Sequence, residues 1–204
     1  MSVLEASRSP ARQAQRAYSV AIVGATGAVG GELIRVLEDR DFPVAGLRLL
    51  ASERSAGKTL EFRGRPVAVE ALSESSFDGV DLALFAADSA TSRAFAPIAR
   101  RAGAVVVDNS SAFRADLDCP LVVPEVNDEA LAYHRGIVAN PNCVATLLCV
   151  AVAPLQRCFG LRRLQVATYQ SASGAGAPAM EELIASTEAF LAGRPFEPKV
   201  LPHP

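Results

Sequence analysis

A strand, a glycine-rich turn and a helix follow one another near the start of the chain, and this unit constrains the fold most strongly. The apolar run from Tyr18 to Val23 has the length of a strand and suits burial in a parallel sheet. Gly24, Gly27 and Gly30 come next, and apolar residues then recur at helical spacing as far as the sequence DRDFP. Such glycines let the backbone turn tightly and approach a pyrophosphate, which the free N–H groups of a helix N-terminus stabilise. A tight turn without a ligand is the alternative, but the complete order of strand, glycines, helix and strand favours a nucleotide.

Strand-like and helical patterns continue to alternate after this unit. LRLLAS, VDLALFAA and AVVVD are predicted strands, SATSRAFAPIARRAG is a predicted helix, and TLEFRGRPVAVEAL is a predicted hairpin that turns near Arg63-Gly64. This alternation predicts an α/β fold with a Rossmann-type doubly wound parallel sheet over residues 17–135. Residues 1–16 are polar and lack the apolar stretch of a secretory signal, so we expect a flexible N-terminal tail.

The character of the sequence changes from about Leu121 onward. LVVPEVN, GIVANPNC and LRRLQVATYQSASGAG suggest strands of a second unit, and APAMEELIASTEAFLAG is a predicted helix. The proline-rich sequence RPFEPKVLPHP follows, with no periodic segment after it to complete a second sheet. We therefore predict that residues 136–204 are the start of a second α+β domain, incomplete in this chain.

Charge and cysteine usage exclude several classes of protein. The net charge of −2 offers no electrostatic footprint for nucleic acid. The longest apolar run is too short to span a bilayer and is interrupted by Pro154, so no membrane segment is predicted. The four cysteines lack the paired spacing of a metal site, so we expect no metal and reduced thiols in a cytoplasmic protein.

The end of the second predicted strand distinguishes between the two nicotinamide dinucleotides. An NAD site usually carries an acidic residue there, to hold the ribose 2′-hydroxyl. This chain has ASERSAGK, in which Glu53 is present but Arg54 lies between it and Ser55, with Ser52 in front. A guanidinium with hydroxyl donors suits a 2′-phosphate, so we predict NADP as the cofactor.

Cys143 occupies an unusual place, directly after the sequence Asn-Pro-Asn and just before a predicted helix that begins near Val144. Asn142 can cap that helix, whose positive N-terminal end lowers the pKa of a thiol and favours the thiolate. The alternative is a small apolar core residue, an interpretation that fits Cys119, Cys149 and Cys158 better.

Other polar stretches could reach the same cleft. DNSSAFR follows a buried strand and presents Arg114, which could hold an anionic group of a substrate at the carboxyl edge of the sheet. YQSASGAG supplies Gln170 at a strand end, then Ser173 and Gly174 for close backbone approach. VPEVN presents Glu125 and Asn127. Each of these alone could be an ordinary polar loop.

Together, GATGAVG, ASERSAGK, DNSSAFR, VPEVN, NPNC and QSASGAG resemble, in the same order, the motifs of the aspartate-β-semialdehyde dehydrogenase family. The resemblance runs from about Tyr18 to the end of the chain. It implies a cytoplasmic homodimer, an oxidoreductase that uses NADPH to reduce L-4-aspartyl phosphate to L-aspartate 4-semialdehyde and phosphate. That product feeds the synthesis of lysine (through diaminopimelate), threonine and methionine.

The resemblance also implies roles for individual residues. Cys143 is the catalytic nucleophile that forms an acyl-thioester, Gln170 contacts the substrate, and Arg114 and Asn142 bind the phosphate or substrate. The NADP contacts fall to residues of three motifs: Gly24, Thr26, Gly27, Ala28, Val29, Gly30, Ser52, Arg54, Ser55, Ser173 and Gly174.

The sequence departs from the family in one respect. In the family, the catalytic histidine and a substrate-binding arginine come from a part that follows the position where this sequence stops. His134, in the predicted surface helix DEALAYHRG, and His203, in VLPHP, do not fill that role. We therefore expect a C-terminally truncated chain with little activity of its own. The alternatives are an enzyme like N-acetyl-glutamyl-phosphate reductase and an inactive NADP-binding fragment.

Overall fold

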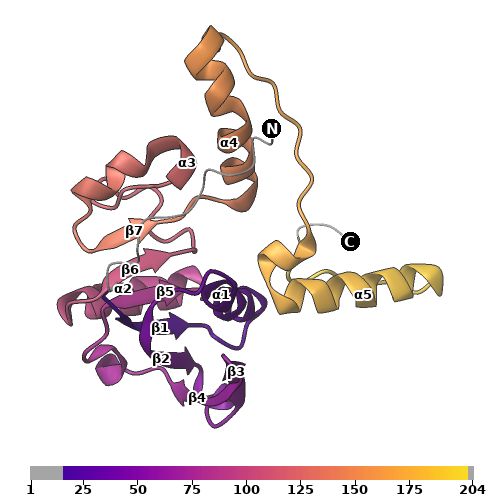
Figure 1. The fold of residues 1–204 in the computed structure, drawn as a ribbon. Coiled ribbons are helices and arrows are strands. Elements are labelled where there is room, and N and C mark those ends of the chain that lie inside the picture. Colours follow the sequence, from indigo (N-terminus) through magenta and orange to yellow (C-terminus); the bar gives the residue numbers. More distant parts are fainter. Residues whose placement is uncertain (1–15, 202–204) are drawn as a thin grey trace, which may run out of the picture.

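A seven-stranded sheet organises the computed structural model, which describes residues 16–201 (Figure 1). The strands lie in the order β3-β4-β2-β1-β5-β6-β7, and only β3 and β4 pair antiparallel. The strands are β1 (Tyr18–Val23), β2 (Val44–Ala51), β3 (Thr59–Phe62), β4 (Arg65–Ala71), β5 (Leu82–Phe85), β6 (Val105–Asp108) and β7 (Ile137–Ala139). The helices are α1 (Ala28–Asp39), α2 (Ser89–Arg101), α3 (Pro124–Asn127), α4 (Cys143–Phe159) and α5 (Ala177–Leu191), with 3-10 helices η1 (Glu53–Ser55), η2 (Glu74–Phe77), η3 (Asp128–Tyr133) and η4 (Ala172–Ala175).

Two cores lie on opposite faces of this sheet, because successive side chains of a strand point to opposite faces. Val20 and Ile22 in β1 pack in one core with Ile34 from α1. Ala21 and Val23 belong to the other core, to which α2 contributes. The predicted Rossmann-type doubly wound sheet is therefore confirmed, with helices on both faces.

The predicted hairpin is also confirmed. β3 and β4 pair antiparallel, with Phe62 opposite Arg65. The turn residues Arg63 and Gly64 have φ angles of 52° and 70°, the left-handed conformation that a tight hairpin turn requires at both central positions.

β7 differs from the sequence prediction, because it extends the first sheet instead of starting a second one. Its three residues pair parallel with Val106, Val107 and Asp108 of β6. The sequence LVVPEVN, also expected to contribute a strand, forms only an isolated bridge from Leu121 to Ala139 and then the short helix α3. Residues from 136 onward, which we had counted with a second domain, thus include one strand of the first sheet.

The sequence LRRLQVATYQ, predicted as a strand, is not one. Residues 161–170 are all exposed and belong to neither a helix nor a strand. A strand is stable only where a neighbouring strand satisfies its backbone hydrogen-bonding groups, and no described segment pairs with this one. Figure 1 shows it as a long arm that leads from the far end of α4 back to η4 and α5. The predicted helix over residues 177–191 is confirmed as α5.

Candidate functional site

The turn between β1 and α1 can be made only with glycine at two of its positions. Gly24 has a φ angle of 83°, and a Cβ there would lie 2.5 Å from the carbonyl oxygen of Ala86. A Cβ on Gly30 would lie 2.3 Å from the carbonyl oxygen of Gly24. Gly27 is the N-cap residue of α1 and places no side chain over the helix end. The first N–H groups of α1, which have no acceptor within the helix, therefore stay open to a ligand.

A cavity of about 430 Å³ lies beside this turn, at the carboxyl ends of β1, β2 and β5. Its lining residues are Val23, Gly24, Thr26, Gly27, Ala51, Ser52, Leu72, Ala86, Ala87, Asp88, Thr91 and Phe95. Four of the predicted cofactor residues are among them, and Ala28, Val29 and Gly30 follow directly in the first turn of α1. This position outside the carboxyl edge of a parallel sheet is where doubly wound proteins bind nucleotides, and the glycine cradle fits a dinucleotide.

The predicted 2′-phosphate residues divide between two environments. Ser52 lines the cavity and is the N-cap residue of η1, whereas Arg54 is exposed and Ser55 is buried beneath it. The backbone N–H of Ser55 donates to the carbonyl oxygen of Ser52 at 2.8 Å, which closes the turn. Glu53 and Arg54 both lie on the exposed side of η1, so the structure leaves the guanidinium without a fixed partner among the described residues.

Asp88 is a residue of this cavity that the sequence analysis missed. Its carboxylate accepts hydrogen bonds of 2.9 Å from the backbone N–H groups of Ala90 and Thr91 and from the Thr91 hydroxyl. These bonds from Thr91 lower the pKa of Asp88 below its ordinary value, so the carboxylate is ionised at neutral pH. The signal was present, since an aspartate directly before a helical pattern is a strong N-cap. Asp88 places a fixed negative charge on the cavity wall.

The loop after β6 is held by a buried carboxylate. Asp108 is fully buried, and its two oxygens accept hydrogen bonds of 2.7 Å from the hydroxyls of Ser92 and Ser110. The Ser110 hydroxyl in turn accepts from the backbone N–H of Ala112 at 3.0 Å. The start of the sequence DNSSAFR is therefore a loop held by side-chain hydrogen bonds.

Arg114 lies at the far end of this loop, half-buried. Its Nε donates to the carbonyl oxygen of Asn140 at 2.9 Å, and its Nη2 donates to the carbonyl oxygen of Asn109 at 2.8 Å. No carboxylate among the described residues lies within ion-pair distance of it. A guanidinium has five N–H donors and is always charged, so most of its binding capacity is open to an anion.

Cys143 is the first residue of α4 and is exposed. The side chain of Asn142 caps the helix as predicted, since its Oδ1 accepts from the backbone N–H of Val144 at 3.0 Å. The Asn142 Nδ2 also donates to Oε1 of Gln170 at 3.4 Å. The structure thus brings Gln170 to the cap of the helix that carries Cys143, although 28 residues separate the two partners.

The other cysteines fit the alternative interpretation only in part. Cys119 is buried, and burial together with the nearby Asp116 carboxylate raises the pKa of its thiol. Cys149 and Cys158, which we expected to be core residues, are exposed, and no residue of α4 is fully buried among the described residues.

The remaining candidates lie apart from these groups. Ser173, in η4, and Gly174 are exposed and do not line the 430 Å³ cavity. Asn127 turns back on its own loop, accepting from the backbone N–H of Val123 at 2.8 Å. His134 is exposed and its Nδ1 accepts from the N–H of Gly136, whereas His203 is outside the described residues.

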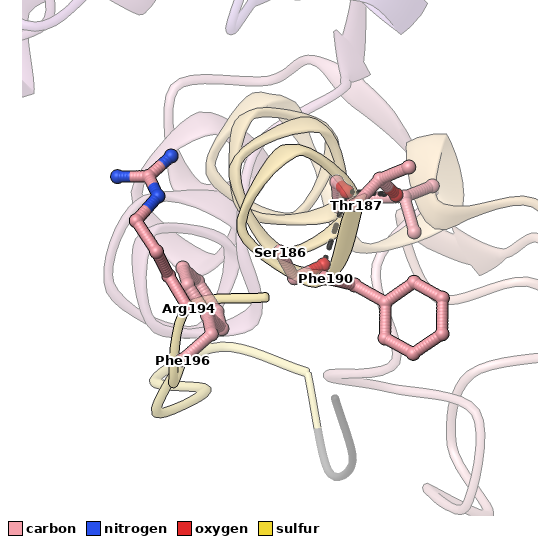
Figure 2. A pocket seen from close by; sticks show the side chains of 6 residues that line it. Ser186, Thr187, Phe190, Arg194 and Phe196 are labelled. Atoms are coloured by element: carbon pink, nitrogen blue, oxygen red, sulfur yellow. Dashed lines mark hydrogen bonds between the residues drawn. The ribbon is translucent and has the colours of Figure 1, made fainter. Parts of the chain in front are cut away.

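A second hollow, of about 530 Å³, lies over α5 (Figure 2). Its lining residues are Leu183, Ser186, Thr187, Phe190, Arg194 and Phe196. The hydroxyls of Ser186 and Thr187 (Figure 2) both donate to the carbonyl oxygen of Leu183 within the helix. This hollow contains none of the predicted site residues and offers few polar groups to orient a substrate, so we place the chemistry at the sheet edge.

The described residues contain neither a cluster of metal ligands nor a membrane-spanning helix. No three of their histidine, cysteine, aspartate or glutamate side chains are grouped so that they could hold a metal ion. No helix in residues 16–201 has the length and apolar character needed to cross a membrane.

Comparison with protein families identifies the group to which these features belong. Residues 19–134 match the family model described as semialdehyde dehydrogenase, NAD binding domain, and residues 152–204 match the one described as semialdehyde dehydrogenase, dimerisation domain. The chain belongs to the semialdehyde dehydrogenase family. The first of these matches spans the glycine turn and every residue that lines the 430 Å³ cavity, and its description supports a nicotinamide cofactor for this domain.

Individual relatives agree with this assignment. Proteins named aspartate-semialdehyde dehydrogenase are 54% identical in Synechocystis, over 91% of this chain and 55% of the relative, and 48% identical in Bacillus subtilis, over 92% and 54%. The crystal structure of aspartate semialdehyde dehydrogenase II complexed with ASA from Vibrio cholerae is 48% identical, with a TM-score of 0.86 over 93% of this chain and 57% of that one. The resemblance inferred from the motifs is confirmed. The chain spans about half the length of the curated relatives that it matches.

Proposed function

We propose that this chain carries the dinucleotide site and the nucleophile of an enzyme that reduces L-4-aspartyl phosphate with NADPH, giving L-aspartate 4-semialdehyde and phosphate. The observation that carries the proposal is the hydrogen bond from Arg114 to the carbonyl oxygen of Asn140. It holds the Arg114 guanidinium, which has no carboxylate partner among the described residues, against the backbone of Asn140, and Asn140 is three residues before the exposed Cys143. An anion-binding group beside a nucleophile is what an acyl phosphate substrate requires.

The acyl-transfer step is performed by residues of this chain. The Cys143 thiolate attacks the acyl carbon and a C–S bond forms. The bond between the acyl carbon and the bridging oxygen then breaks, and phosphate leaves with that oxygen and the electron pair. Arg114 binds the phosphoryl oxygens and stabilises the charge that grows on the leaving group. Cys143 is exposed at the first position of α4, where a substrate can reach its thiol.

Asn142 and Gln170 orient the substrate in this proposal. Their hydrogen bond joins the helix cap to the start of the loop that contains Ser173 and Gly174. NADPH, when bound, supplies the hydride that reduces the thioester. No hydrogen bond among the described residues connects a histidine to Cys143, so we assign the proton transfer to no residue of this part of the chain.

NADP rather than NAD is the proposed dinucleotide, and the arrangement at η1 supports this choice. Ser52 lies on the cavity wall and Arg54 is exposed next to it, where an extra phosphate on the ribose would meet both. Glu53, which would serve a 2′-hydroxyl, is exposed in the same turn. Homodimer formation through residues 152–204 is part of the proposal and is supported by the description of the family model that matches them.

Acyl transfer can be tested separately from hydride transfer. We expect L-4-aspartyl phosphate to acylate Cys143 in the purified chain, detected as a mass increase by peptide mapping, and we expect Cys143→Ser to remove the modified peptide. Cys149→Ser is the matched control, because Cys149 is an exposed cysteine on the same helix, and it should leave the labelling intact. Acylation that persists in Cys143→Ser would refute the nucleophile, and faster acylation by N-acetyl-glutamyl phosphate would point to the related reductase instead.

A further inference from the structure

Two asparagines join the ends of three neighbouring strands at the edge of the sheet. Asn109 follows β6 and Asn140 follows β7. The Nδ2 of Asn140 donates to Oδ1 of Asn109 at 2.6 Å, and the Nδ2 of Asn109 donates to the carbonyl oxygen of Phe85, the last residue of β5, at 3.0 Å. The two side chains therefore form a continuous hydrogen-bonded connection across β5, β6 and β7.

The same two asparagines hold Arg114, but through their backbones. Its guanidinium donates to the carbonyl oxygens of Asn140 and Asn109 from two different nitrogens. A guanidinium is planar, so two bonds to carbonyl oxygens just past the ends of two strands fix both its position and the direction in which its other donors point. The two hydrogen bonds keep their length and alignment only while the two carbonyl groups keep their separation.

We propose that the hydrogen bond between the Asn109 and Asn140 side chains is a positioning device for Arg114. It sets the separation of the two carbonyl groups that hold the guanidinium. It thereby sets the place of the bound phosphate relative to Cys143, which follows Asn140 by three residues. This inference rests on the proposed function, in which Arg114 binds the phosphate.

The backbone hydrogen bonds between the strands do not depend on the hydrogen bond between the Asn109 and Asn140 side chains. β6 and β7 are paired up to Asp108 and Ala139, and the N–H of Asn140 still donates to the carbonyl oxygen of Asp108 at 2.8 Å. The loop after β6 is also fastened from the other side by the buried Asp108 carboxylate. Removing the side-chain hydrogen bond between Asn109 and Asn140 should therefore leave the sheet intact. It should loosen only the residues past the edge of the sheet, which are those that hold Arg114.

Asn140→Leu tests this, because leucine has nearly the size and shape of asparagine but cannot donate to Asn109. With the purified chain, calorimetric titration with inorganic phosphate should give a dissociation constant about ten-fold higher than in the unsubstituted chain, as expected when a charged hydrogen-bonding group loses its alignment. The Arg114 side-chain Nε–H, observed by NMR, should exchange with water faster, because its bond to the carbonyl oxygen of Asn140 is weakened. The smaller Asn140→Ser, which cannot span the 2.6 Å contact, should give the same two changes.

Asn127→Leu is the matched control. Asn127 is also a half-buried asparagine with two side-chain hydrogen bonds, to Leu121 and Val123, and its replacement should change the thermal midpoint without changing phosphate affinity or the Arg114 exchange rate. Unchanged phosphate affinity and slow Nε–H exchange in both Asn140 variants would overturn the inference.

Failure of the proposed function gives a different result. If Arg114→Ala binds phosphate as tightly as the unsubstituted chain, or the unsubstituted chain binds none, Arg114 is not the phosphate ligand and the proposed function loses its anion site. If Arg114→Ala loses binding while both Asn140 variants keep it, the function stands and only the positioning role is wrong.

Discussion

Gly30→Ala should strongly destabilise the protein, whereas the same substitution one position later should stabilise it. A Cβ on Gly30 would lie 2.3 Å from the carbonyl oxygen of Gly24 and 2.7 Å from Cα of Ala25. Both are backbone atoms that cannot turn aside, so α1 has to shift away from β1. A Cβ on Gly31 would meet nothing within 4 Å.

The magnitudes follow from two opposing effects. Glycine to alanine inside a helix gains up to about 1 kcal/mol of helix propensity, and Gly31→Ala should show that gain undiminished. Forcing extra atoms into packed structure costs about 1 to 3 kcal/mol, and contacts this short place Gly30→Ala at the upper end. The two variants should therefore differ by about 3 kcal/mol in the free energy of unfolding.

Urea unfolding of both variants measures this difference, provided that the free energy of unfolding depends equally steeply on the urea concentration in both. Because Gly30 lies in the first turn of α1, next to the proposed dinucleotide site, Gly30→Ala should also weaken NADPH binding in calorimetry, and Gly31→Ala should not. Equal stability of the two variants would refute the close approach of α1 to the turn, and equal stability with equal NADPH affinity would refute the geometry of the whole glycine cradle.

Three further outcomes are expected at the other groups. Asp88→Ala should lower the free energy of unfolding by about 1 kcal/mol at neutral pH, as for other helix caps. Since folding lowers the pKa of Asp88, this contribution is present above the unfolded pKa of about 4 and is lost as the pH falls through the lower folded value. Chemical unfolding should therefore show a smaller difference between the two proteins at pH 3 than at pH 7, and a constant difference would contradict the cap. In brief iodoacetamide treatment followed by peptide mapping, Cys143 should be alkylated fastest, and Cys119, buried with a raised thiol pKa, slowest; uniform labelling would argue against a special thiol at the start of α4. Arg54→Ala should weaken NADPH binding about ten-fold and leave NADH binding unchanged, as the loss of one charge-assisted contact implies, and equal titration curves for the two dinucleotides before and after substitution would sink the NADP assignment.

Local sequence signals were sufficient for the part of the fold whose partners are close in sequence. The order of strand, glycines and helix gave β1 and α1 because each element carries its own periodicity, and Arg63-Gly64 gave the hairpin because the turn requires a left-handed backbone. The partner of a strand is not encoded in the strand itself. This is why β7 was assigned to the wrong sheet and why residues 161–170, with suitable residues but no neighbour, were predicted as a strand.

The candidate site was predictable at the level of motifs but not of contacts. Sequence indicated Arg114 and Asn142, and the structure gives Asn142 the expected capping bond. It could not indicate that Asn109 and Asn140 would meet, because the two are 31 positions apart and only the pairing of β6 with β7 brings them together. Asp88 was visible as a helix cap, yet its place on the cavity wall depends on the neighbouring strands β1 and β2.

The arm formed by residues 161–170 has to stay largely extended. α4 has 17 residues, so it carries the chain about 25 Å away from Asn142 at 1.5 Å per residue. The arm must cover that distance again to place Gln170 against Asn142, and its reach when fully extended is only about 33 Å. A helix over these ten residues would span only about 15 Å at 1.5 Å per residue, well short of that distance. The extended course of the arm is therefore a condition for the contact between Gln170 and Asn142, and the chemistry proposed for Cys143 depends on a segment that touches neither the sheet nor the cysteine.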